Sequence, residues 1–162
     1  MEGTDVFEWL EASALAVYIR QSHVLYPIIE IIHILGFVLL VGSAFLFDLR
    51  LLGISNRMSV TGIARHLLPW SRRSLWLVIP AGVLLFMTQA TELSQNRYFG
   101  IKLILILLAF ANAGYFHRYT FRTVTRWDQQ QPTPLAARAA AVISITLWTG
   151  VITCGRFLAY FE

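Results

Sequence analysis

Six ionisable side chains lie within or beside long apolar segments: Glu30, His33, His66, Lys102, His117 and Arg156. An ionisable residue at membrane depth is costly unless it is paired or bound, so each of them is a candidate functional residue. A histidine in such surroundings is suited to ligate a metal ion or haem iron, and we expect this of His33. The alternative is an ion-paired interior, in which Glu30 contacts Lys102 or the Lys102 ammonium reaches the membrane interface.

His66 and His117 are expected near the opposite membrane boundary. Two histidines at one level predict a second site, in which both imidazoles ligate iron. The alternative is a pair of interfacial histidines in contact with water. His23 is expected on the surface.

The composition is that of a membrane protein. Of the 162 residues, 57% are hydrophobic and 14% are charged, against about 25% charged in soluble domains. The mean hydropathy is +0.62. These values exclude a disordered chain and disfavour an ordinary soluble domain. The one cysteine excludes a disulfide framework and a cysteine-based zinc site.

Four segments approach the length of about 20 apolar residues that a membrane-spanning helix needs. They cover about residues 26–47, 74–90, 98–117 and 135–160. No segment alternates with period two, so the sequence predicts an all-α protein. Because the connections are short, we expect a four-helix up-down-up-down bundle that forms a single membrane domain over residues 1–162.

Two further pieces are expected to lie on the membrane surfaces. Residues 1–22 show a helical period with one apolar face and predict an amphipathic helix on the outer surface. Residues 60–68 predict a similar, separate piece on the inner surface, before Pro69.

The basic residues predict the orientation of the chain. Two of the loops contain most of the arginines: Arg50, Arg57, Arg65, Arg72 and Arg73 in the first, and Arg118, Arg122 and Arg126 in the second. Both loops are therefore expected in the cytoplasm of a bacterium, with both termini outside the inner membrane. The net charge of +4 is then a topology signal, and we expect no nucleic-acid partner.

A rise of about 1.5 Å per residue places His33 about 10 Å below the outer boundary. Lys102 lies at a similar depth, Glu30 stands one turn above His33, and Arg156 approaches the same level from the last span. Two polar features of the later spans are also expected to face the interior. Asn112 needs a partner there, and a stripe of small residues recurs at helical spacing: Thr146, Thr149, Gly150 and Thr153.

Several motifs carry a family resemblance. The first span contains Ile32-His33-Ile34-Leu35-Gly36 and ends Asp48-Leu49-Arg50-Leu51, and the third begins with Phe99-Gly100-Ile101-Lys102-Leu103. These motifs resemble those of HemJ-type protoporphyrinogen oxidases and CopD-type membrane proteins. The string Arg65-His66-Leu67-Leu68-Pro69-Trp70, with Asn112 and His117, is more similar to an uncharacterised family of small bacterial four-span membrane proteins.

HemJ-type proteins bind haem b through a histidine and a lysine. The resemblance implies that His33 and Lys102 are the axial ligands here, with lysine binding as the neutral amine. The resemblance to CopD-type proteins would imply copper transport, for which three methionines are few. There is no Cys-x-x-Cys-His motif for covalent haem attachment.

We therefore expect a haem b-binding protein for electron transfer, acting alone or as the membrane subunit of a redox complex. Arg156 would neutralise a haem propionate, and His66 and His117 would hold a second haem if two are bound. Its partners would be lipid, a quinone or a redox protein, or further copies or other subunits in an oligomer. The alternatives are a non-catalytic accessory subunit and a porphyrinogen- or quinol-oxidising enzyme in which Glu30 moves protons.

Overall fold

A computed structural model describes residues 2–158 and 160 of the chain, and the described residues contain helices and turns but no strand. Residues 1, 159, 161 and 162 of the predicted single domain lie outside the described residues. The elements in order are α1 (Glu2–Glu11), α2 (Ala14–Gln21), α3 (Leu25–Leu51), α4 (Val60–Thr88), α5 (Ala90–Gln95), α6 (Arg97–Tyr115), the π-helical turn η1 (Phe116–Thr120), the 3-10 helix η2 (Phe121–Arg126) and α7 (Leu135–Phe157). The all-α prediction is confirmed.

The helix α4 is longer than predicted. It is one continuous helix that begins at the cap formed by Ser59, whose hydroxyl accepts a hydrogen bond of 3.0 Å from the Gly62 amide. The separate surface piece predicted over residues 60–68 is wrong, because those residues are the first turns of α4. Pro69 and Pro80 lie inside the helix. Each removes a backbone hydrogen bond, but packing along α3 holds the helix together.

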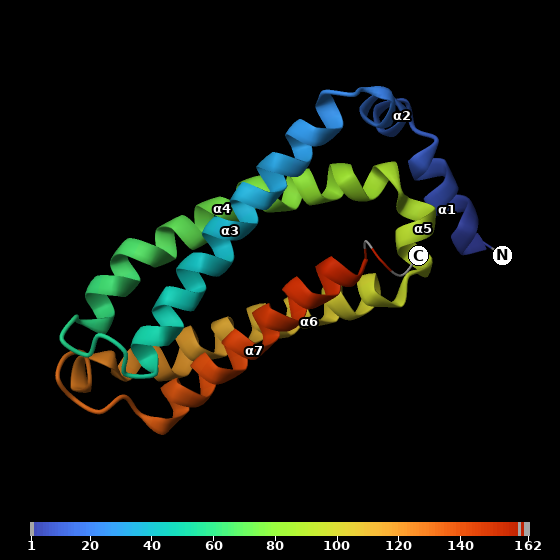
Figure 1. Ribbon diagram of the computed structural model, residues 1–162. Helices are drawn as coiled ribbons and strands as arrows, with labels where there is room; N and C mark the ends of the chain where they lie inside the picture. The colour runs from blue at the N-terminus through green and yellow to red at the C-terminus, as the bar shows by residue number, and fades with distance from the viewer. Residues whose placement is uncertain (1, 159, 161–162) are drawn as a thin grey trace.

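The long helices form two pairs (Figure 1). One pair is α3 with α4 and the other is α6 with α7, and α3 also packs on α7. The pairs meet where α3 ends and α4 begins, and they diverge towards the end that carries α1, α2 and α5 (Figure 1). At Gly36, α3 approaches α4 so closely that an added methyl group would lie 2.8 Å from a methyl carbon of Val78. Small residues thus permit the close contact within the first pair.

A buried arginine joins the two pairs at the end where they meet. Arg50, at 2% exposure, donates from Nε to the Met58 carbonyl at 2.6 Å and from a terminal nitrogen to the Asp128 carbonyl at 3.2 Å. The Asp128 carboxylate in turn accepts from the Thr61 amide at 2.7 Å and from its hydroxyl at 2.8 Å. The α3–α4 connection and the segment before α7 are therefore tied together by hydrogen bonds.

The first 22 residues form two helices rather than the single one predicted. The chain turns between α1 and α2, where the Ser13 hydroxyl accepts from the Ala16 amide. Ile19 of α2 is buried against α3 and α4. Arg20 and Glu11 form an ion pair of 3.0 Å, and Arg20 also donates to the Thr88 carbonyl at the end of α4.

Three helical stretches of the described residues are long and apolar enough to cross a membrane: Leu25–Leu51, Arg97–Arg126 and Leu135–Phe157. Their outward faces expose large apolar side chains, including Ile34, Leu35, Val38, Ile104, Leu107, Ile143 and Ile152. An apolar surface of this extent needs a lipid or protein partner. The uncharged part of α4 is shorter, because Arg72 and Arg73 lie inside the helix. A fourth crossing stays a prediction.

The carboxylate of Asp128 should contribute measurably to stability. We expect Asp128→Ala to lower the free energy of unfolding in detergent by about 1–2 kcal/mol, since it removes a capping acceptor from the first turn of α4. Thr61→Val removes only the hydroxyl bond and should cost less. Equal thermal shifts for the two variants would contradict this account.

The contacts of α1 with α5 and with α2, both made by Glu11, should weaken in acid. Hydrogen bonds from Thr91 and the charge of Arg20 lower the pKa of Glu11 below its ordinary value of 4.5. A lowered pKa in the folded protein stabilises it above pH 4.5, and this contribution is lost as the pH falls through the folded-state value. The pair is partly exposed, so we expect an effect on the order of 0.5–1 kcal/mol. Unfolding measured from pH 7 to pH 3 should show this loss in the wild type, and its absence in Glu11→Gln.

Candidate functional site

A cavity of about 520 Å³ lies between the two diverging helix pairs. Its volume is within the range of about 300–1,000 Å³ that small-molecule and cofactor sites occupy. Its walls are apolar and rich in aromatic residues from four helices: Phe37 of α3, Phe86 of α4, Phe99 and Phe110 of α6, and Trp148 of α7. Among the lining residues that the structure describes, His33 and Lys102 are the only ionisable ones.

The His33 imidazole has a defined tautomer. Its Nδ1 lies 3.0 Å from the carbonyl oxygen of Val78 on α4. A carbonyl only accepts, so Nδ1 carries the hydrogen and Nε2 has a free lone pair when the ring is neutral. Histidines that ligate metals commonly donate their second ring nitrogen to a backbone carbonyl in this way. The arrangement therefore prepares Nε2 of His33 as a ligand.

Gly82 provides the space in which the His33 ring lies. A methyl group on Gly82 would lie 2.9 Å from Cε1 and 3.3 Å from Nδ1 of His33. Any larger residue would push the ring away from α4. The glycine on α4 thus positions the imidazole on α3, and one turn away Val78 supplies its hydrogen-bond acceptor.

Lys102 reaches the same cavity from α6 and is half-buried. Its amine lies near α7, where a methyl group on Gly155 would be 3.7 Å from Nζ. In the part of the chain that the structure describes, the one ion pair is Arg20 with Glu11, so the alternative pair of Glu30 with Lys102 does not form. A lysine without an anionic partner in apolar surroundings favours the neutral amine.

Aromatic contacts close the cavity around these two side chains. The rings of Phe86 and Phe99 stack with centroids 5.3 Å apart and connect α4 to α6. Trp148 packs edge-on against both Phe37 and Phe110, at 6.2 Å in each case. The site can hold a flat apolar group and offers it one nitrogen from α3 and one from α6.

The other two residues predicted for this level lie outside the cavity. Glu30 is exposed. Arg156 is also exposed, and it donates to the Tyr160 hydroxyl at 2.7 Å with its guanidinium 4.9 Å from the centre of that ring. Of the four residues grouped by depth, the fold brings together His33 and Lys102 alone.

His66 and His117 line different cavities. His66 is exposed beside the α3–α4 connection, and its Nδ1 is 3.0 Å from the Gly62 carbonyl. His117 lines a smaller cavity between α3, α4, α6 and α7, with its ring stacked on Phe47. The geometry does not join these histidines in one site.

The predicted interior stripe of α7 is wrong for its three threonines, whereas Gly150 is half-buried and packs against Leu105 of α6. Thr146, Thr149 and Thr153 are exposed. The hydroxyls of Thr146 and Thr153 donate to the carbonyls four residues earlier, so they need no interior partner. The buried face consists of Ala137, Ala140, Ala141, Trp148, Val151 and Cys154. The prediction for Asn112 is confirmed, since its amide donates to the Ala140 carbonyl at 3.0 Å.

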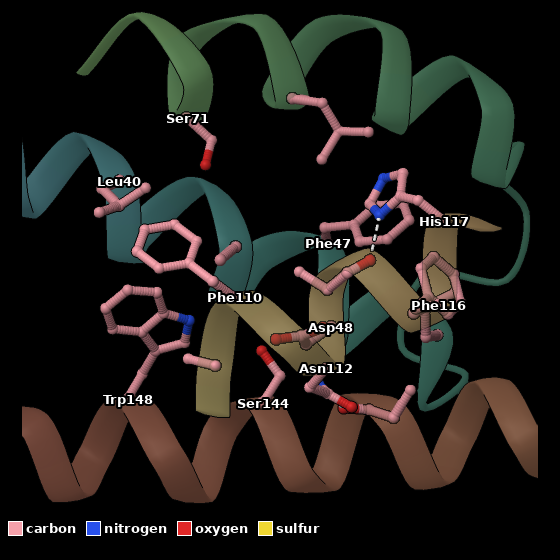
Figure 2. Close-up of a pocket in the computed structure, with 16 residues that line it drawn as sticks. Leu40, Phe47, Asp48, Ser71, Phe110, Asn112, Phe116, His117, Ser144 and Trp148 are labelled. Carbon is pink, nitrogen blue, oxygen red and sulfur yellow. Dashed lines mark hydrogen bonds between the residues drawn. The ribbon is translucent and has the colours of Figure 1, made fainter. Parts of the chain in front are cut away.

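Sequence reasoning missed a polar group at Asp48. This residue is 6% exposed and lines the smaller cavity together with Ser71, Asn112 and Ser144 (Figure 2). Helical spacing could have indicated that Asp48 is buried, because it shares a helical face with the buried Leu40 and Leu51.

Comparisons with known proteins identify a family but no function. A family model described as a family of unknown function (DUF6644) matches residues 6–161. No curated protein and no solved structure matches the chain.

Alanine at Gly82 and at Gly42 should have opposite effects. We expect Gly42→Ala to raise stability by about 0.5–1 kcal/mol, since no atom lies within 4 Å of the added methyl group and alanine is the better helix former. Gly82→Ala should instead lower stability, because the methyl group displaces the His33 ring from the Val78 carbonyl. Detergent unfolding of both variants tests this, and equal gains in stability would contradict the packing of His33 on Gly82.

Proposed function

The chain belongs to the DUF6644 family, and we propose that it is a haem b-binding membrane protein that serves electron transfer. The observation that carries the proposal is the pair of nitrogen ligands, His33 and Lys102, in one apolar, aromatic cavity of about 520 Å³. The resemblance to HemJ-type proteins, in which a histidine and a lysine hold the haem, supports the same pair.

The residues fit this cofactor in their chemistry. Nε2 of His33 would be one axial ligand, and the carbonyl of Val78 orients the ring through Nδ1. Nζ of Lys102 would be the other, and its apolar surroundings favour the neutral amine that can donate a lone pair. Bound haem supplies a reversible one-electron change at iron, with a potential that axial ligands and burial tune.

The aromatic walls have two roles in this proposal. Phe37, Phe86, Phe99, Phe110 and Trp148 give a low-polarity lining for the porphyrin faces and exclude water from the ligand nitrogens. We propose one haem per chain rather than two, since His66 and His117 line separate cavities. Arg156 is paired with Tyr160 and takes no part.

The proposed setting is a bacterial inner membrane crossed four times. The pairing of α4 with α3 along its length supports a fourth crossing beside the three apolar ones. The arginine-rich ends then lie in the cytoplasm and the two termini outside. The cavity is nearer the outer end, where a quinone or a redox protein would exchange electrons.

The oxidase alternative has weaker support. It requires Glu30 to move protons at the cofactor, whereas Glu30 is exposed and does not line the cavity. The remaining alternative is an accessory subunit without a cofactor. A visible spectrum distinguishes it from a haem protein.

A visible spectrum tests the proposal. The full chain, produced with an adequate haem supply and purified in detergent, should show a Soret band and about one haem per chain. His33→Ala should remove most of the bound haem, because it deletes one of two axial ligands. Lys102→Met keeps a long apolar side chain at the second position and should change the spectrum without unfolding the protein.

His23→Ala is the matched control, since His23 is an exposed histidine just before α3. It should keep the wild-type spectrum. A folded but colourless wild type would reject haem binding and favour the accessory subunit. Equal haem content in the His33 and His23 variants would reject the proposed ligand.

A further inference from the structure

A second cavity, separate from the proposed haem site, lies among α3, α4, α6 and α7 near the end where the helix pairs meet. Its volume is about 100 Å³, which is room for several water molecules. The polar side chains that line it are Asp48, Ser71, Asn112, His117 and Ser144 (Figure 2).

Two buried polar atoms at this cavity have no hydrogen-bond partner, namely Oδ2 of Asp48 and Nε2 of His117. The Nδ1 of His117 lies 2.9 Å from the Ala113 carbonyl and therefore donates to it, which leaves Nε2 of the neutral ring as an acceptor. The carboxylate of Asp48 is also an acceptor. Neither acceptor has a hydrogen-bond partner, and water in the cavity would supply the missing hydrogens.

Hydrogen bonds from water alone do not stabilise an ionised Asp48 carboxylate in this cavity. An ionised carboxylate buried among apolar helices costs several kcal/mol unless a cation pairs with it. No lysine or arginine is among the lining residues that the structure describes. The guanidinium of Arg50, two residues along α3, is occupied by the carbonyls of Met58 and Asp128.

The elements packed around Asp48 contribute one other titratable group. The lining residues of α4, α6 and α7 are apolar or neutral and polar, and η1 supplies His117. The described chain has no group of three or more His, Cys, Asp or Glu that would hold a metal ion. A single carboxyl group with one imidazole and a hydroxyl is better suited to a proton than to a transition metal.

We propose that Asp48 is a buried proton-binding site, which holds a proton as the neutral carboxylic acid at neutral pH. The Ser144 hydroxyl lies beside the Asp48 side chain in this cavity (Figure 2), and cavity water completes the hydrogen bonding of Oδ2. On deprotonation the proton leaves to water, and the carboxylate remains with Ser144 and the cavity water as donors. The site takes a proton whether or not the larger cavity contains a cofactor.

Infrared spectroscopy of the full chain in lipid vesicles tests the site without any bound cofactor. At pH 7 the wild type should show a protonated-carboxyl C=O band that shifts when carboxyl-¹³C aspartate is incorporated and again in D₂O. Asp48→Asn should abolish this band. Glu30→Gln, which changes an exposed carboxyl group on the same helix, and Asp128→Asn should retain it.

Ser144→Ala keeps Asp48 and provides the test if the Asp48 variant does not fold. Loss of the hydroxyl partner should shift the frequency of the labelled band. The proposal would be overturned if the wild type shows no labelled band at pH 7, or if the band persists in Asp48→Asn. It would also be overturned if Ser144→Ala leaves the frequency of the band unchanged. Replacement of sodium by choline should leave the band unchanged, and a band that grows on removal of sodium would assign the site to sodium instead.

Discussion

The hydrogen bonds around Arg50 hold the architecture together. The guanidinium is almost fully buried and donates to carbonyl groups of the α3–α4 connection and of the segment that leads into α7. Asp128 adds to these hydrogen bonds, because its carboxylate caps the first turn of α4. The two helix pairs are joined at this end and diverge towards the other (Figure 1). The space between them becomes the cavity that His33 and Lys102 share.

Two polar environments follow one another along the helices, and Leu40, Phe110 and Trp148 line both of them. In the larger cavity, the polar atoms are ligand-type nitrogens within aromatic walls, and a backbone carbonyl orients the His33 ring. In the smaller cavity they include two acceptors without a hydrogen-bond partner, Oδ2 of Asp48 and Nε2 of His117. The first suits a flat cofactor and the second suits a proton with water. Electron transfer at one end and proton binding at the other would lie in the same four helices, and each is open to separate measurement.

The limits of α3, α6 and α7 were predictable to within a few residues because apolar runs of sufficient length leave few other structures, whereas α4 begins well before its predicted start. That His33 and Lys102 line one cavity was also predictable, since depth along two parallel helices follows from counting residues. The rotation of each helix about its own axis, which decides the face that is buried, was not predictable. Thr146, Thr149 and Thr153 resembled an interior stripe, yet α7 turns its alanine face inward because Ala137, Ala140 and Ala141 permit closer packing.

The sequence alone determined that the chain is all-helical and has long apolar segments. Both properties depend only on the hydrogen bonding and the hydropathy within each segment. Which ionisable groups meet depended on the contacts between helices. Glu30 and Arg156 have the right depth but face outward, and Asp48 lies near the end of its helix yet is buried. Only packing between segments far apart in the chain decides such placements, because a hydropathy pattern specifies a face of a helix but not the neighbour against which that face packs.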